Sequence, residues 1–273
     1  MRERSLRQSF LGERSDEILQ DVVVGIVGLG GGGSHIAQQL AHLGVKHFML
    51  CDPDFIEETN LNRLIGATAK DVEQKTRKTI IAERLITGIH PGAQCIRIEE
   101  SWDTRLDTLS RCDAIFGCLD SYMARDQLER FSRRFLIPYF DIGMDVHDDA
   151  DHFSITGQVI RSMPGEPCMR CLGVIHEDDV NRESLRYGAA GGKPQVVWSN
   201  GILASTAVGL FLEIITPWHF DARPVACLDY DGNRHTVVRR GTLAYAEDGV
   251  CPHHKANEVG DPFFSLRPAQ DSP

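Results

Sequence analysis

The hydrophobic pattern of the first half of the chain alternates between two kinds of segment. Short apolar-rich runs, typical of strands buried on both faces of a sheet, lie at 22–27, 45–50, 95–98, 114–119 and 137–142. Segments with apolar residues at helical spacing lie between them, at 36–43, 71–87, 106–109 and 122–135. Repeated strand–helix pairs predict an α/β fold, with a Rossmann-like, mostly parallel sheet and helices on both faces.

The second half has a different pattern. Strands are expected at 152–161, 224–230 and 234–239, the last two joined as a hairpin around Asp231-Gly232-Asn233. A long apolar segment at 196–216 predicts a buried helix, and the polar, Gly-rich stretch at 173–194 predicts a crossover loop. We therefore expect a smaller antiparallel part that continues the first sheet.

A glycine-rich stretch follows the first predicted strand. Gly28, Gly30 and Gly33 fit the spacing G-x-G-x-x-G, in which the glycines allow a tight turn, close approach of a phosphate and helix–strand packing. Asp52 lies about 20 residues further on, the usual place for an acid that binds ribose hydroxyls. The pattern predicts nucleotide binding, and the alternative is a glycine turn that merely packs tightly.

Domain organisation follows from these patterns. Residues 1–21 are expected to be an N-terminal arm, and residues 22–145 the nucleotide-binding half. Residues 146–257 form one continuous domain with that half, and 258–273 are expected to be a loose tail.

Composition narrows the function classes. The formal net charge of -10 argues against a broad nucleic-acid surface. The polar, charged start of the chain shows no signal-peptide pattern, and the apolar run at 201–215 contains Ser205, Thr206 and Glu213. We therefore expect a cytoplasmic protein without a membrane span.

Four residues have the spacing of metal ligands. Cys168-x2-Cys171 and Cys251-x2-His254 could close a tetrahedral, structural zinc site that clasps two distant segments, with His253 as an alternative fourth ligand. The competing interpretations are unconnected thiols or a redox pair at Cys168 and Cys171. The other cysteines lie in or beside predicted strands and are expected to be small buried hydrophobes.

Several polar residues follow the predicted strand ends. Asn60, Arg63, Lys75 and Lys78 come soon after Asp52, and Asp120 directly follows another strand. Phosphate transfer needs cationic and amide donors and a magnesium ion held by a carboxylate, for which Asp120 is the candidate. Taken alone, Lys75 and Lys78 would be helix-surface charges.

Together these motifs resemble the ThiF/MoeB/HesA family, the prokaryotic relatives of ubiquitin-activating enzymes. The resemblance runs from about Arg7 to His254. It is carried by residues 28–34, Asp52-Pro53-Asp54, Asn60-Leu61-Asn62-Arg63, Cys118-Leu119-Asp120-Ser121, Cys168 with Cys171, and Asn200-Gly201.

The resemblance implies an enzyme that binds Mg-ATP and adenylates the C-terminal glycine carboxylate of a ubiquitin-like or sulfur-carrier protein, releasing pyrophosphate. The half at 146–257 would dock the carrier. Asp52, with Asp54 beside it, would hold the ribose, and the glycine turn the phosphates. Asn60, Arg63 and Lys78, or Lys75 as second choice, would contact the triphosphate. Asp120 would serve magnesium and the incoming carboxylate, and Arg7 would reach the γ-phosphate from the partner subunit of a homodimer.

The sequence departs from the family pattern in two places. The second metal pair is Cys-x-x-His, where the family usually has Cys-x-x-Cys, and no cysteine occurs between Leu172 and Pro194. Family members that form a thioester with their carrier often keep a cysteine in that region. The acyl-adenylate is therefore expected to pass to an acceptor outside this chain, such as a conjugating enzyme, a sulfurtransferase or a small molecule.

Three rival functions remain open. A nicotinamide-dependent oxidoreductase would explain the glycine turn and Asp52 but would leave Arg63, Asp120 and the metal pairs without a role. The same fold could adenylate a carboxylate on a modified tRNA or a small molecule, although the acidic balance argues mildly against RNA. A zinc-clasped binding module without ATP turnover would leave the polar groups idle.

Overall fold

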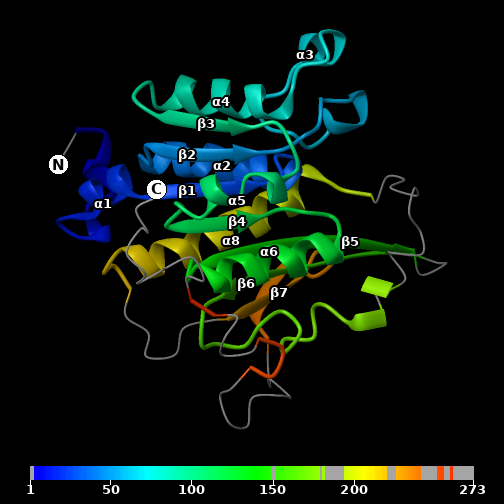
Figure 1. Cartoon of the computed structure of the whole chain (residues 1–273). Helices are drawn as coiled ribbons and strands as arrows, with labels where there is room; N and C mark the ends of the chain where they lie inside the picture. Colours follow the sequence, from blue (N-terminus) through cyan, green and yellow to red (C-terminus); the bar gives the residue numbers. More distant parts are fainter. Residues whose placement is uncertain are drawn as a thin grey trace, which may run out of the picture.

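A computed structural model describes residues 3–148, 152–178, 180–181, 194–219, 226–240, 251–254 and 259–260. Eight strands form one sheet in the order β3-β2-β1-β4-β5-β6-β7-β8 (Figure 1). The strands are β1 (Val23–Val27), β2 (His47–Cys51), β3 (Gln94–Ile98), β4 (Ala114–Gly117), β5 (Tyr139–Asp148), β6 (Phe153–Ser162), β7 (Cys227–Asp231) and β8 (Thr236–Arg239).

The helices connect these strands in the order that the hydrophobic pattern predicts. The α-helices are α1 (Ser15–Asp21), α2 (Gly31–Leu43), α3 (Ala69–Glu73), α4 (Lys78–Ile89), α5 (Leu106–Leu109), α6 (Tyr122–Arg134) and α8 (Val197–Ile215). Short 3-10 helices are η1 (Glu3–Leu11), η2 (Glu58–Asn60) and η3 (Trp102–Thr104).

The sheet joins a parallel part to an antiparallel part. β3, β2, β1, β4 and β5 pair in parallel, whereas β6, β7 and β8 are antiparallel to their neighbours. This confirms the predicted fold class. The strand order reverses at β1, which has β2 on one side and β4 on the other, and ligands in open α/β sheets bind at such a switch point.

Both faces of the parallel strands are buried, as the apolar runs predict. Val24 and Ile26 of β1 belong to the cluster that contains α2 and α8, whereas Val27 belongs to the cluster that contains α5 and α6. Figure 1 shows α6 across one face of the sheet and α8 on the other. α8 is the one described helix long and apolar enough to cross a membrane, but it packs against α2, β5 and β6 as an interior helix.

The start of α2 differs from the prediction. The helix was expected from residue 36, but it begins at Gly31, so Gly31, Gly32 and Gly33 form its first turn. A β-carbon on Gly33 would lie 1.9 Å from the carbonyl oxygen of Gly28, and only glycine permits this contact. The predicted end at Gly44 is confirmed, because Gly44 is in the left-handed conformation with φ 103°.

The single helix predicted at 71–87 is wrong. Two helices, α3 and α4, occupy this region and are separated by a turn in which Lys75 has a φ of 47°. Thr68 and Asp71 cap α3 reciprocally, and Phe55 forms an isolated β-bridge with Arg77 across the turn. Apolar spacing alone did not reveal this break, because the apolar positions on both sides of the turn fit one helical period.

Two other segments are more ordered than predicted. β5 continues to Asp148, well past the predicted end at 142, because it pairs with β6 over ten residues. The predicted arm at 1–21 contains η1 and α1, and Gln8 Nε2 donates a hydrogen bond to the carbonyl of Leu43 at the end of α2. The crossover loop at 173–194 and the tail at 258–273 lie largely outside the described residues.

The contact between Gly33 and Gly28 gives a stability prediction. We expect Gly33→Ala to lower the free energy of unfolding by about 2–4 kcal/mol, because its β-carbon must displace backbone. Gly88→Ala in α4 is the matched control. Its β-carbon meets nothing within 4 Å, so it should raise stability by about 0.5–1 kcal/mol. Urea unfolding of both variants would measure this, and equal stabilities would contradict it.

Candidate active site

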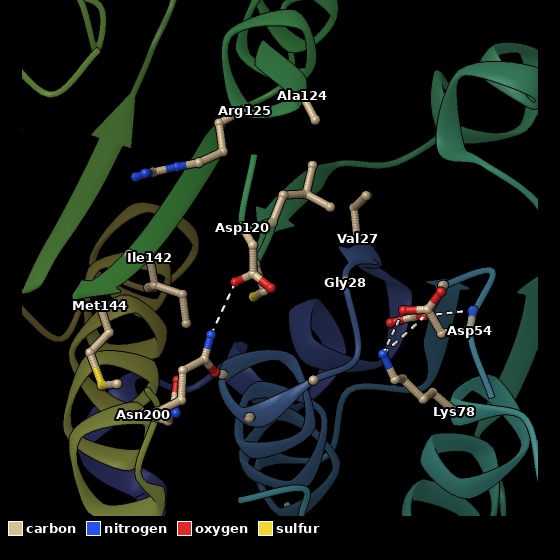
Figure 2. A pocket seen from close by; sticks show the side chains of 18 of the residues that line it. Val27, Gly28, Asp54, Lys78, Asp120, Ala124, Arg125, Ile142, Met144 and Asn200 are labelled. Carbon is tan, nitrogen blue, oxygen red and sulfur yellow. Dashed lines mark hydrogen bonds and ion pairs between the residues drawn. The ribbon is translucent and has the colours of Figure 1, made fainter. Parts of the chain in front are cut away.

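A pocket of about 350 Å³ opens at the carboxyl ends of β1, β2 and β4 and beside the middle of β5 (Figure 2). Its volume lies in the range of small-molecule sites in proteins. Its lining includes Gly28, Gly30, Asp52, Asp54, Asn60, Arg63, Lys78 and Asp120 among the residues predicted from sequence. The structure thus brings most of the predicted phosphate and ribose groups to one cavity.

The glycines that fit the motif have different physical roles. Gly28 has a φ of 90°, and a β-carbon there would lie 2.4 Å from the carbonyl oxygen of Cys118. Gly33 packs against Gly28 and does not line the pocket. At Gly30, by contrast, a β-carbon would meet nothing within 4 Å, so the pocket has free space beside the start of α2. No side chain caps this 13-residue helix, so its first N–H groups and its dipole favour an anion there.

Asp52 is fixed at the end of β2. Its Oδ2 accepts a 2.7 Å hydrogen bond from the Leu29 N–H, and its Oδ1 accepts one of 2.9 Å from the Asp54 N–H. The residue is 4% exposed, and this burial raises the pKa of its carboxyl, while Lys78 and the two N–H groups oppose the rise. A carboxylate held in this way is oriented to accept further hydrogen bonds at the pocket wall.

The two candidate lysines are separated by the turn between α3 and α4. Lys78 Nζ lies 2.7 Å from Asp54 Oδ2 and 3.8 Å from Asp52 Oδ1, and it lines the pocket (Figure 2). Lys75 lies in the turn and is not among the residues that line the pocket. The geometry therefore favours Lys78, which is the first choice from sequence.

Asn60 and Arg63 come from the loop around η2. Asn60 Oδ1 accepts from the N–H of Glu57, which holds the loop in a capping box. Arg63 Nη1 donates to the carbonyl of Thr59 at 2.6 Å and to Asn62 Oδ1 at 3.0 Å. A β-carbon on Gly31 would lie 3.3 Å from Arg63 Cδ, so the stem of the arginine passes over the start of α2.

Asp120 lies on the other side of the pocket, beyond the end of β4. Figure 2 shows it pointing into the cavity between Asn200 of α8 and the pair formed by Asp54 and Lys78. Its Oδ1 accepts a 3.1 Å hydrogen bond from Gln195 Nε2. The residue is exposed, so its carboxylate remains accessible to a cation or a substrate.

Sequence reasoning missed a buried ion pair at the pocket wall. Arg125 of α6 donates from Nε to both oxygens of Asp141 in β5, at 3.0 and 3.2 Å, and Tyr139 donates to Asp141 Oδ2 at 2.7 Å. Burial opposes the charge on Arg125, but Asp141 raises the pKa of its guanidinium above the ordinary value. An aspartate inside a predicted buried strand was the available signal, although it did not identify its partner.

The only cysteines among the pocket-lining residues are Cys51 and Cys118. Burial raises the pKa of the Cys51 thiol to about 12 and that of Cys118 well above its usual range, and neighbouring aspartates raise both further. Both thiols are therefore protonated at neutral pH and are weak nucleophiles.

Arg7 lies away from the pocket of its own chain. It is an exposed residue of η1, next to Gln8, whose side chain binds the C-terminal end of α2. The pocket lies at the N-terminal end of the same helix, about 20 Å away at 1.5 Å per residue. A contact between Arg7 and this site would therefore have to come from another subunit.

The predicted metal ligands form a compact cluster with one change. Cys168 Sγ and Cys251 Sγ each lie 3.6 Å from Cys171 Sγ, and His253 Nδ1 lies 3.4 Å from Cys168 Sγ and 3.3 Å from Cys171 Sγ. A tetrahedron with zinc–sulfur bonds of about 2.3 Å places its sulfurs about 3.8 Å apart. The donor set and spacing therefore fit a closed, four-coordinate metal site.

The fourth member of this cluster is His253 and not His254, which was the first choice from sequence. His254 turns inward, with its Nε2 3.9 Å from Glu129 Oε2 of α6, and is 8% exposed. Glu129 also accepts hydrogen bonds from the N–H of Met169, between the two cysteines. The spacing in the sequence allowed either histidine, and only the path of the chain distinguishes them.

Comparisons with known proteins show the family to which the chain belongs. The sequence profile of the ThiF family matches residues 3–251. The sulfur carrier protein ThiS adenylyltransferase of Escherichia coli is 30% identical over 203 residues, which cover 73% of this chain and 76% of that protein. The ubiquitin-like modifier-activating enzyme 5 of Arabidopsis thaliana is 26% identical over 171 residues, 57% of this chain but only 38% of that protein.

Solved structures agree on the fold. The E. coli MccB structure with ATP has a TM-score of 0.71, covering 88% of this chain and 71% of that chain at 18% sequence identity. The fold, the pocket and these similarities define an enzyme of the adenylyltransferase class. The chain belongs to the ThiF family.

The cysteine–histidine cluster gives a metal prediction. We expect purified protein to carry about one zinc ion per chain, and chelation to lower its melting temperature. His253→Ala should lose zinc readily to a competing chelator, whereas the matched variant His254→Ala should retain it. Metal analysis by mass spectrometry after desalting tests this, and zinc loss from His254→Ala alone would reverse the assignment.

Proposed function

We propose that this protein uses ATP to adenylate the C-terminal glycine carboxylate of a ubiquitin-like or sulfur-carrier protein. A carboxylate oxygen of the carrier attacks the α-phosphorus of ATP, the bond to the β-phosphate oxygen breaks, and pyrophosphate leaves. The acyl-adenylate then passes to an acceptor outside this chain. The observation that carries this proposal is the arrangement of the start of α2, the Asp52–Lys78 pair and Asp120 around one pocket.

In the proposed nucleotide site, separate elements of the fold would bind the phosphates and the ribose of ATP. The uncapped start of α2, with free space beside Gly30, would receive phosphate oxygens. Lys78, Arg63 and Asn60 would supply donors to the triphosphate, and Asp52 would accept from a ribose hydroxyl. Groups that are fixed before the substrate arrives can stabilise charge on the leaving pyrophosphate without reorganising.

Asp120 is the proposed carboxylate for a magnesium ion. It is an exposed oxygen donor at the pocket wall opposite Lys78, as such a site requires. When bound, magnesium would neutralise phosphate charge. Asp120 would hold that ion on the side of the pocket that receives the incoming carboxylate.

The antiparallel half supports a docking role for a carrier tail. Ile142, Gly143 and Met144 of β5 and Gln158 of β6 line the side of the pocket away from Asp52. The side chains of Gln158 and Arg125 pack against Gly143 where a β-carbon would otherwise lie, and they would offer donors to an extended tail that ends in glycine. The relatives named above include a ThiS adenylyltransferase, which supports a protein carrier as the substrate class.

An ATP–pyrophosphate exchange assay tests the proposed reaction. We expect exchange that depends on a ubiquitin-like or sulfur-carrier protein ending in glycine and that falls about 100-fold or more in Asp120→Ala. Asp107→Ala, which changes an exposed aspartate of α5, should retain full exchange. If exchange occurs with a small-molecule or tRNA carboxylate but does not occur with any carrier protein, the proposed substrate is wrong.

The two lysines allow a second test. Lys78→Ala should raise the KM for ATP and lower exchange by about tenfold or more, because a charged donor to the phosphates is lost. Lys75→Asn should remain within about twofold of the wild type, since asparagine tolerates the left-handed conformation at this turn. A larger loss in Lys75→Asn than in Lys78→Ala would contradict the assignment.

Arg7 supports the further proposal of a homodimer with shared sites. Mixing Arg7→Ala with Asp120→Ala subunits should restore up to about a quarter of the wild-type activity at sites that combine two intact halves. Arg7→Ala mixed with itself is the control and should stay inactive. Absence of restoration in a mixed dimer that is shown to form would exclude a shared site.

A further inference from the structure

A chain of hydrogen bonds crosses the pocket between two of its proposed functional residues. Arg63 Nη1 donates to Asn62 Oδ1 at 3.0 Å, and Asn62 Nδ2 donates to the main-chain carbonyl of Gln195 at 3.3 Å. Gln195 Nε2 then donates to Asp120 Oδ1 at 3.1 Å. We call these four residues the Gln195 bridge.

The bridge joins three segments that are far apart in the sequence. Asn62 and Arg63 follow η2, Asp120 follows β4, and Gln195 directly precedes α8, 75 residues after Asp120. Gln195 also lines the pocket itself, so the bridge is part of the cavity wall and not a remote surface contact. The segments that contain Asn62 and Asp120 belong to different strand–helix units, and Gln195 forms a hydrogen bond with each of them.

The two ends of the bridge use different atoms of Gln195. The main-chain carbonyl receives Asn62, whereas the side-chain amide reaches Asp120. A long side chain such as that of the half-buried Arg63 loses conformational freedom when it is held in one orientation. The bridge provides such restraint before any substrate binds, and its neutral amide engages one oxygen of Asp120.

We propose that Gln195 is a positioning residue for the adenylation reaction, which fixes Arg63 and Asp120 relative to one another across the pocket. This inference rests on the proposed function, in which Arg63 contacts the triphosphate and Asp120 serves magnesium. With Oδ1 of Asp120 engaged by the amide, Oδ2 is the oxygen that would be left to bind a cation. The consequence is that Mg-ATP binding depends on Gln195, whereas docking of the carrier tail along β5 and β6 does not.

Two single variants cut the bridge at different links. Gln195→Ala removes the link to Asp120 but keeps the carbonyl that Asn62 binds, and Asn62→Ala removes the links to Arg63 and to Gln195. Each should lower kcat/KM for Mg-ATP by about tenfold, with the KM for the carrier unchanged. One broken link already releases Arg63 from Asp120. The double variant should therefore have the same kcat/KM for Mg-ATP as the less active of the two single variants.

Gln94→Ala is the matched control. It removes the same side-chain type from an exposed position on the edge strand β3, so it should leave the kinetics within about twofold of the wild type. Melting temperatures of all variants report whether any loss reflects unfolding. If the free-energy losses in kcat/KM of the two single variants add fully in the double variant, Asn62 and Gln195 act independently and the proposed bridge is wrong.

Binding measurements separate this inference from the proposed function. If the wild type binds Mg-ATP but catalyses no exchange with any carrier, the adenylation proposal fails and the bridge is judged on affinity alone. About tenfold weaker Mg-ATP binding by Gln195→Ala in calorimetry would then support the bridge, and unchanged binding would overturn it. A wild type that binds no Mg-ATP would refute both.

Discussion

The approach of Gly33 to the carbonyl of Gly28 is the constraint on which the site depends. With 1.9 Å between that oxygen and the place where a β-carbon would be, α2 begins directly against the end of β1. This contact directs the free N–H groups of the helix into the pocket, and it leaves the open space beside Gly30 where a phosphate fits. The glycine motif thus allows α2 to pack closely against β1, and the anion site at the start of α2 results from that packing.

Charge around the pocket is organised by pairing. Lys78 lies between Asp52 and Asp54, and Arg125 is held by Asp141, so these two cations have fixed anionic neighbours. Arg63, by contrast, donates to neutral oxygens of Thr59 and Asn62. Such pairs cost desolvation energy, and their value in an enzyme is a defined geometry more than stability. Asp120, exposed and bound only by a neutral amide among its described contacts, differs from the other carboxylates here.

The sequence was sufficient for much of the fold and for most pocket residues. Apolar runs identified the strands and the order of the elements, since burial on both faces of a parallel sheet leaves a strong signal. The spacing of residues in the sequence did not predict features that depend on how distant segments of the chain come together. It did not show the break at Lys75, the inward turn of His254, or the partner of Asp141, because each depends on contacts between distant segments. Gln195 carried no signal, because an isolated glutamine before a helix is common in any loop.

Helix α6 links the pocket to the cysteine–histidine cluster. Arg125 lines the pocket, and Glu129, one turn later, binds the backbone between Cys168 and Cys171. The cluster also needs Cys251, which lies 80 residues after Cys171 in the chain. During synthesis on the ribosome, the nucleotide-binding segments therefore emerge long before this support for α6 can close. Cys251 is thus the last of the three cysteines to be synthesised, and the cluster that supports α6 can be complete only after that segment has been made.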